Sequence, residues 1–318
     1  MADLTFDDSH NMVAYLEKSE DNADFAEIVD FLNASPIWYA LTVSPIVYVS
    51  YIEQFWSTAK IKTVNNETQI CAKLDGKTIV ITESSVRRDL HFNDEDGITC
   101  LTNTEIFENL QLMGYEKLSD KLTFYKSFFS PQWKYLIHTI LQCLSSKSTA
   151  WNEFGTNIAS AVICLAKKQK FNFSKLIFDG MLRNLDPNSK KFLMYPRFLQ
   201  LFLNNQIENL TAVFNDEYDT PSHTKKVFAN MRRQGKDFSG TVTPLFATML
   251  IQSQAVEGEG SGQPTEPQHT PTTASPSHVE PIPIVASSSQ PKKTRKTKRK
   301  ALRYLSLVEL YLIADGYP

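Results

Sequence analysis

The period of the apolar residues changes in one part of the chain, and this change limits the possible folds more than any other feature. Ile70, Ala72 and Leu74 stand at every second position before Asp75-Gly76, and Ile79 and Ile81 do so after it. An Asp-Gly pair tolerates the positive φ angles of a tight turn, so the pattern predicts an antiparallel hairpin. Lys60–Val64, followed by Asn65-Asn66, can add a third strand. The flanking segments have helical spacing, which indicates a mostly helical α+β domain with a small antiparallel β-meander.

Helices are expected on both sides of the meander, because apolar residues recur there every three or four positions. One should end near Ser35, and a second should begin at Ser44-Pro45, with serine as cap and proline in the first turn. After the strands, Thr82 is expected to cap a short helix on which Arg87 and Arg88 form a solvated face, in preference to an anion clamp. Later helices are expected after Thr102, which forms a capping box with Glu105, up to Gly114, after Ser130-Pro131, along the stripe from Trp151 to Leu165, near Ser174 and after Tyr195-Pro196.

The C-terminal part of the chain has a different composition. No Phe, Trp or Tyr occurs from Ile251 to Gln290, and this stretch with Pro291 contains seven of the fifteen prolines. Such a segment buries too little apolar area to offset its ordering entropy. We therefore expect a flexible N-terminus (1–8), an α+β domain (9–245), a disordered Pro/Ser/Thr-rich linker (246–300) and a short apolar segment (301–318).

The segment 301–318 leaves two interpretations open, a genuine element and a gene-model or reading-frame artefact. It is too short and too charged to span a bilayer, so no membrane partner is expected. The first thirty residues contain neither a secretory signal nor an Arg-rich transit peptide, which favours the cytoplasm or the nucleus.

Charge is strongly segregated, although the whole chain has a net charge of only -2. Residues 1–59 contain ten acids and one base, and residues 125–214 contain eleven bases and four acids. This asymmetry favours either a polyanionic partner for the cationic middle or attraction between the two parts of the chain, and it does not separate the two.

The densest charge in the chain is a basic cluster at the end of the expected linker. Its seven lysine and arginine side chains attract the phosphate backbones of nucleic acids by counterion release, without recognising the nucleotide sequence. They also match a simple nuclear import signal. Nucleic acid, an import receptor and a second copy of the chain are therefore the candidate partners, and plain solubilising charge is the third interpretation of the cluster. The candidate binding residues are Lys292, Lys293, Arg295, Lys296, Lys298, Arg299 and Lys300.

Motifs of known enzyme and metal sites are missing from the sequence. No phosphate-binding loop, nucleophile elbow or HExxH pair occurs, and the loop Asn93–Gly97 resembles a calcium loop only around its glycine. His138 lies beside an apolar stripe, which favours a core-edge residue over a catalytic one. No catalytic residue, metal or cofactor is predicted. The four cysteines, expected to be reduced and partly buried, are Cys71, Cys100, Cys143 and Cys164.

Several short blocks resemble a domain that plant LTR retrotransposons have spread in many copies, the plant transposon protein domain. The resemblance covers roughly Met12 to Asn204 and the basic tail, and this family has no established catalytic residues. The chain contains no CCHC knuckle, Asp-Ser/Thr-Gly triplet or Tyr-x-Asp-Asp motif of the element enzymes. The blocks are Met12–Lys18, Ile28–Ser35, Tyr51–Trp56, Ile81–Arg88, Asp96-Gly97, Phe129–Trp133 and Phe192–Pro196.

The resemblance implies a retrotransposon-derived, non-enzymatic module that interacts with protein or nucleic acid. The alternative that stays open is a hydrolase or nuclease-like domain of a retroelement, whose catalytic carboxylates come together only in the fold. Carboxylates that converge in one cleft would favour this alternative.

Overall fold

The structure is a computed structural model that describes residues 12–116, 121–146, 153–188, 192–207, 217–218, 224 and 243–250. All of them lie in the first of the two units of the chain, Met1–Gly260. The expected flexible N-terminus (1–8), the basic cluster (292–300) and the apolar segment (301–318) lie outside the described residues.

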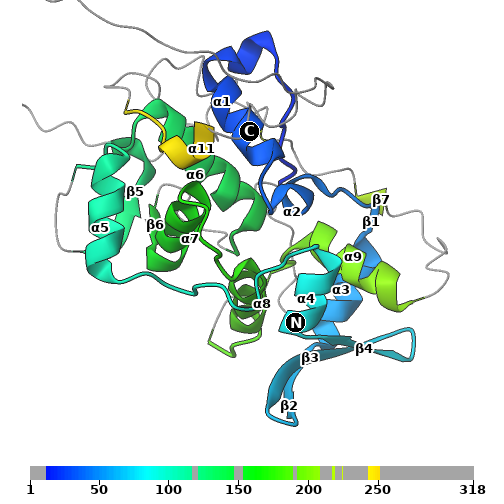
Figure 1. Cartoon of the computed structure of the whole chain (residues 1–318). Helices are drawn as coiled ribbons and strands as arrows, with labels where there is room; N and C mark the ends of the chain where they lie inside the picture. Colours follow the sequence, from blue (N-terminus) through cyan, green and yellow to red (C-terminus); the bar gives the residue numbers. More distant parts are fainter. Residues whose placement is uncertain are drawn as a thin grey trace, which may run out of the picture. The chain divides into compact units, whose positions relative to one another are not determined.

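Helices make up most of the described chain, and short strands lie between them (Figure 1). This arrangement confirms the mostly helical α+β fold. The helical elements are η1 (Glu20–Phe25), α1 (Ala26–Asn33), α2 (Trp38–Thr42), α3 (Val49–Thr58), α4 (Glu83–Asp89), α5 (Asn103–Leu112), η2 (Lys126–Phe128), α6 (Pro131–Leu144), α7 (Thr156–Ala166), α8 (Phe173–Asn184), α9 (Pro196–Gln206) and α11 (Ala247–Leu250). The strands are β1 (Val47–Tyr48), β2 (Lys60–Val64), β3 (Glu67–Leu74), β4 (Lys77–Ile81), β5 (Thr123–Tyr125), β6 (Glu153–Gly155) and β7 (Glu217–Tyr218).

The predicted meander is an antiparallel sheet with the strand order β2-β3-β4. Both turns contain two residues with positive φ, at Asn65-Asn66 and Asp75-Gly76, as tight hairpin turns require. One face of the sheet is buried at Ile70, Ala72 and Leu74 and packs against α3. The alternation in the sequence therefore predicted the strands, their turns and their buried face.

The core is built from the helix faces that the apolar spacing predicted. The most extensive of them belongs to α6, where twelve of fourteen residues are buried. Helix α6 packs against α2 and α7, and α9 contacts both α3 and α4. Two predicted helix ends are also confirmed, since Thr102 and Glu105 form their capping box and Gly114 has a φ of 87°.

The prediction that a helix begins at Ser44-Pro45 is wrong. Helix α3 begins at Val49, because Val47 and Tyr48 form strand β1 and pair with β7. The Tyr48 amide also donates to Gln200 Oε1 at 3.0 Å. Contacts far away in the sequence therefore hold this segment extended.

The predicted helical stripe from Trp151 to Leu165 is correct only from Thr156 onward. Phe154 lies in strand β6, which pairs with β5, and its ring packs against Phe124 and Phe129. Trp151 lies outside the described residues.

The described domain extends past the expected boundary at residue 245. Helix α11 occupies the start of the segment that the composition assigned to the linker. Phe246 packs on Trp133 with ring centroids 4.8 Å apart, Thr248 donates to the Ala166 carbonyl oxygen, and Met249 is buried.

Candidate functional site

The acidic loop after α4 and the first turn of α8 form the most connected polar cluster of the described chain. We call it the Asp94 junction. The Asp94 carboxylate is 6% exposed and accepts hydrogen bonds from the Ser174 amide at 2.8 Å and the Ser174 hydroxyl at 2.7 Å. It also accepts from Arg87 Nε at 2.9 Å. The junction consists of Glu83, Arg87, Asp94, Asn172 and Ser174.

Arg87 joins the two carboxylates of the junction. Its guanidinium donates to Glu83, one helical turn earlier, at 2.6 Å as well as to Asp94. Burial alone would lower the pKa of Arg87, but the hydrogen bonds to Asp94 and Glu83 outweigh burial and raise it. The prediction of a solvated face is therefore wrong for Arg87, whose side chain is 16% exposed, whereas Arg88 is 65% exposed and pairs with Asp89.

The backbone around Gly97 fixes the position of this acidic loop. The Ile98 amide donates to the Lys170 carbonyl oxygen and the Asn172 amide donates to the Ile98 carbonyl oxygen, which forms a short parallel bridge. A Cβ atom on Gly97 would lie 2.7 Å from the Asn172 nitrogen. Glycine is required here because two backbone segments approach closely.

The centre of the junction is buried. Ser174 is fully buried and Asp94 nearly so, and both carboxylates are engaged by Arg87, Asn172 or Ser174. A Ser-carboxylate pair without a histidine also has no base that could activate the hydroxyl in the manner of a triad. The arrangement holds α4, the acidic loop and α8 together, and it is not a calcium loop because Arg87 and Ser174 use the oxygens of Asp94.

Residues of different sequence blocks of the resemblance contact each other inside the domain. Trp56 Nε1 donates to the Met194 carbonyl oxygen at 3.3 Å. The Tyr195 hydroxyl donates to the Leu144 carbonyl oxygen at 2.9 Å, and its backbone has a φ of 45° directly before α9. Trp133 of a third block is fully buried. These residues build the fold.

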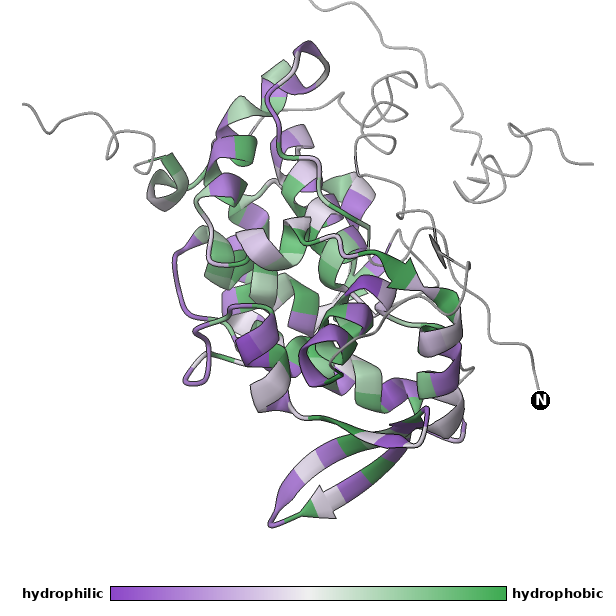
Figure 2. Cartoon of the chain, turned by 90° about the vertical axis from the view of Figure 1, so that its right-hand side faces the viewer, coloured by the Kyte–Doolittle hydropathy of each residue, from purple (hydrophilic) through white to green (hydrophobic). Residues whose placement is uncertain are grey.

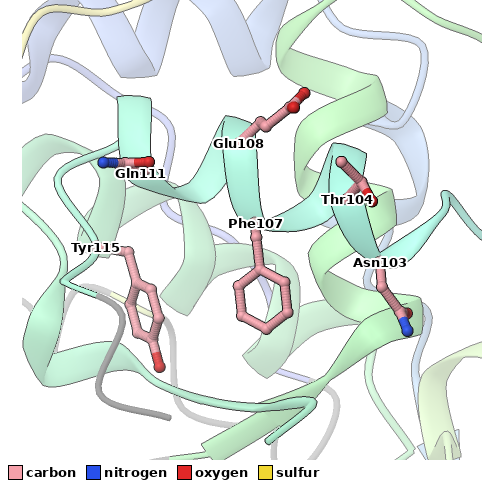
Figure 3. A pocket seen from close by; sticks show the side chains of 6 residues that line it. All are labelled: Asn103, Thr104, Phe107, Glu108, Gln111 and Tyr115. Carbon is pink, nitrogen blue, oxygen red and sulfur yellow. The ribbon is translucent and has the colours of Figure 1, made fainter. Parts of the chain in front are cut away.

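A partly open hollow with a volume of about 340 Å³ lies beside α5 (Figure 3). Its lining contains one carboxylate, Glu108, so it offers no pair of acids for acid-base chemistry. The Phe107 and Tyr115 rings also pack on Phe124 in the core. Its lining residues are Asn103, Thr104, Phe107, Glu108, Gln111 and Tyr115.

Part of the positive charge of residues 125–214 lies inside the domain. Lys126, Lys134 and Arg197 are at most 5% exposed. Arg197 donates to the carbonyl oxygens of Val43 and Cys143, and burial lowers its pKa to about 10, which leaves it charged at neutral pH. The net charge of the segment therefore overstates the charge on its surface.

The structure also places the remaining candidate residues of the described chain. His138 lies 3.0 Å from Lys126 Nζ through Nδ1, and burial lowers its pKa well below the ordinary value, helped by Lys126 and Lys134. Cys143 and Cys164 are buried free thiols, Cys71 is half-buried and Cys100 is exposed. Among the described residues, no group of three or more His, Cys, Asp or Glu side chains could hold a metal ion. The seven bases of the cluster lie outside this part of the chain.

Comparison of the chain with protein-family models, with curated proteins and with solved structures gave no match. In the part of the chain that the structure describes, no helix combines the length and the hydropathy needed to cross a membrane.

Proposed function

We propose that this chain is a non-enzymatic interaction module derived from a plant LTR retrotransposon, and that it binds nucleic acid through the basic cluster at 292–300. The observation that carries the proposal is that residues of the resembling sequence blocks make contacts that stabilise the domain itself. In three of these blocks, polar atoms of Trp56, Arg87 and Tyr195 bind other parts of the same domain. Residues that served a reaction would instead direct polar atoms toward a cavity.

The interaction function is therefore expected on surfaces that the core does not use. Seven lysine and arginine residues within nine positions neutralise phosphates without recognising nucleobases, so binding should depend on the salt concentration and not on the nucleotide sequence. If all seven engage double-stranded DNA, the logarithm of the binding constant should fall with the logarithm of salt concentration with a slope of about -6.

The test is a titration of the full chain with fluorescent double-stranded DNA at several salt concentrations. The variant has alanine at all seven positions of the cluster, and it should lose the steep slope while its thermal unfolding stays unchanged. The matched control replaces the exposed Lys167 and Lys168, at the end of α7, by alanine. If the seven-alanine variant keeps the steep salt dependence and the Lys167/Lys168 control loses it, binding belongs to the folded domain and our proposal is refuted.

The same seven-alanine variant tests the import function. A reporter fused to the full chain should accumulate in nuclei, and the variant fusion should not. Equal accumulation of both fusions would exclude the import function. The DNA probe also tests the enzyme alternative, because its cleavage in the presence of Mg²⁺ would contradict a non-enzymatic module.

A further inference from the structure

The free edge of β2 is the most exposed backbone of the sheet. In the described chain no strand pairs with the outer edge of β2, and all five of its residues are exposed. The tip of the β2–β3 hairpin extends beyond α3 and α4, and Figure 2 shows polar and apolar residues alternating along it. A row of unpaired amides and carbonyl groups is a template for another strand.

The turn at Asn65-Asn66 determines which backbone groups face outward. In a two-residue hairpin the pair next to the turn, here Val64 and Glu67, is hydrogen-bonded, and bonded and non-bonded pairs then alternate. The amide and carbonyl groups of Ile61 and Thr63 therefore point to the free edge. In this register Thr58 and Lys73 would form the next hydrogen-bonded pair beyond Lys60 and Cys71. The observed contacts agree, because the Thr58 hydroxyl accepts from the Lys73 amide and donates to the Lys73 carbonyl oxygen.

The opposite edge of the sheet is protected. By the same alternation, the backbone groups of Val80 in β4 point outward. The side-chain amide of Gln206 accepts from the Val80 amide at 3.1 Å and donates to its carbonyl oxygen at 3.0 Å. Helix α9 thus supplies a substitute for a neighbouring strand on β4, whereas β2 has none among the described residues.

The charges beside the free edge define what could bind there. Three lysines, Lys60, Lys62 and Lys73, lie on the outer face of the sheet together with one acid, Glu67, because the cross-strand partners of these residues are not on the buried face. None of the three makes an ion pair within the described chain. Ile61 lies on the other face and is 47% exposed. A fitting strand would place acids toward the lysines and apolar side chains toward Ile61.

A second copy of β2 fits this edge poorly in an antiparallel arrangement. Antiparallel pairing of Ile61 with Ile61 places Lys60 opposite Lys62, and pairing of Ile61 with Thr63 places Lys62 opposite Lys62. Like charges directly opposite are destabilising. Pairing of Thr63 with Thr63 avoids the lysines but places Ile61 opposite the turn residue Asn65, so only one bonded pair remains.

We infer that the free edge of β2 binds an extended segment of another protein, with acidic side chains at alternate positions and apolar ones between them. The segment would add a fourth strand, hydrogen-bonded to Ile61 and Thr63. The inference uses none of the residues of the basic cluster, so it does not depend on nucleic-acid binding.

The test measures binding of two fluorescent peptides by anisotropy, one with alternating Asp and Val and one with alternating Lys and Val. All measurements use the full chain with the seven-alanine cluster, because the intact cluster would attract the acidic peptide. We expect at least tenfold tighter binding of the acidic peptide. Equal binding of the two peptides would overturn the inference.

Proline variants locate the binding edge. Thr63→Pro removes an outward amide without breaking the β2–β3 ladder and should weaken binding of the acidic peptide at least tenfold. Thr78→Pro is the matched control, since the Thr78 amide also points outward but on the β4 edge, and it should leave binding unchanged. Equal effects of the two prolines would refute the inference.

Hydrogen exchange provides a measurement that needs no variant. The acidic peptide should slow exchange of the Ile61 and Thr63 amides and leave Val80 unchanged. Unchanged exchange at both positions would overturn the inference even if the peptide binds elsewhere. Concentration-dependent dimers in sedimentation that Thr63→Pro abolishes would instead show that a second copy occupies the edge.

Discussion

Replacement of Asp94 by alanine removes the acceptor at the centre of the Asp94 junction. The Ser174 amide and hydroxyl lose their bonds of 2.8 and 2.7 Å, and Arg87 loses one of its two carboxylates. All of these groups lie at or below 16% exposure, so water cannot easily replace the lost acceptor. The domain should therefore become less stable.

The magnitude follows from what remains at the junction. Loss of one partner of a buried ion pair costs about 3–5 kcal/mol. The lower end applies here, because Glu83 still pairs with Arg87 at 2.6 Å. At about 2–4 °C per kcal/mol for a domain of this size, a loss of about 3 kcal/mol lowers the melting temperature by about 6–12 °C.

The assay is thermal unfolding of the full chain, followed by circular dichroism. Asp96→Ala is the matched control from the same loop, since Asp96 pairs with Lys170 at 2.7 Å but is 76% exposed. Exposed pairs contribute little to stability, so this variant should melt with the unchanged protein. The double variant with Asp94→Ala and Arg87→Met should lose less stability than the sum of the single variants, because the pair between Arg87 and Asp94 is then lost only once and neither partner remains buried without the other. The reasoning is wrong if Asp94→Ala and Asp96→Ala lower the melting temperature equally.

Three further predictions concern other parts of the domain. Gly97→Ala should cost about 1–3 kcal/mol in unfolding free energy by overpacking, whereas Gly155→Ala, with no atom within 4 Å of its new Cβ, should cost much less; equal denaturation midpoints would contradict the close approach at Gly97. In the native protein, maleimide should label the exposed Cys100 quickly and leave the buried Cys143 and Cys164 unlabelled. Burial raises the pKa of Cys143 to about 12 and that of Cys164 to about 11, so neither thiol forms the reactive thiolate at neutral pH. Mass spectrometry of the labelled protein measures this, and rapid labelling of Cys143 would exclude the buried environment. Burial lowers the pKa of His138 in the folded domain, so the imidazole binds a proton more readily in the unfolded chain. The stability of the domain should therefore fall as the pH drops below about 6.5, and the His138→Gln variant should lose less stability between pH 7 and 5. Identical pH profiles of the variant and the unchanged protein would refute the lowered pKa of His138.

Local signals in the sequence predicted the elements that need no distant partner. Asp75-Gly76 can adopt its two positive φ angles whatever the rest of the chain does, and the Thr102–Glu105 capping box closes within one helical turn. The helix after Tyr195-Pro196 begins at Pro196 because proline is suited to the first helical turn. Such features depend on neighbours within a few residues.

Features with distant partners were not predictable in the same way. Ser44-Pro45 has the composition of a helix start, yet β7 and Gln200 hold the next residues extended. Strands β5 and β6 have only three residues each, too few for a period to be recognised. Their pairing depends on the packing of Phe124 and Phe154, which the sequence separates by thirty residues.

The polar cluster was missed for the same reason. From the sequence, Arg87 is predicted to be a solvated residue on a short helix. Its partner Asp94 lies in an acidic loop that matches a calcium-binding loop only around Gly97, so the sequence does not indicate that the two residues pair. Ser174 lies 80 residues beyond Asp94. The available signal was Gly97, since a glycine in an acidic loop also permits close backbone approach, and the observed approach is to Asn172.

The contacts of residues in the resembling sequence blocks show what they do in this chain. Trp56, Arg87, Gly97 and Tyr195 come from four blocks, and each is explained by a contact within the domain. Such residues maintain the fold, and a fold by itself does not determine what the protein binds. The β2 edge has the opposite property, because Lys60 and Lys62 contribute no ion pair to the described domain and could be replaced without cost to its core. Specific function in this chain is therefore to be sought in residues that the fold does not need, such as the lysines beside the free edge of β2.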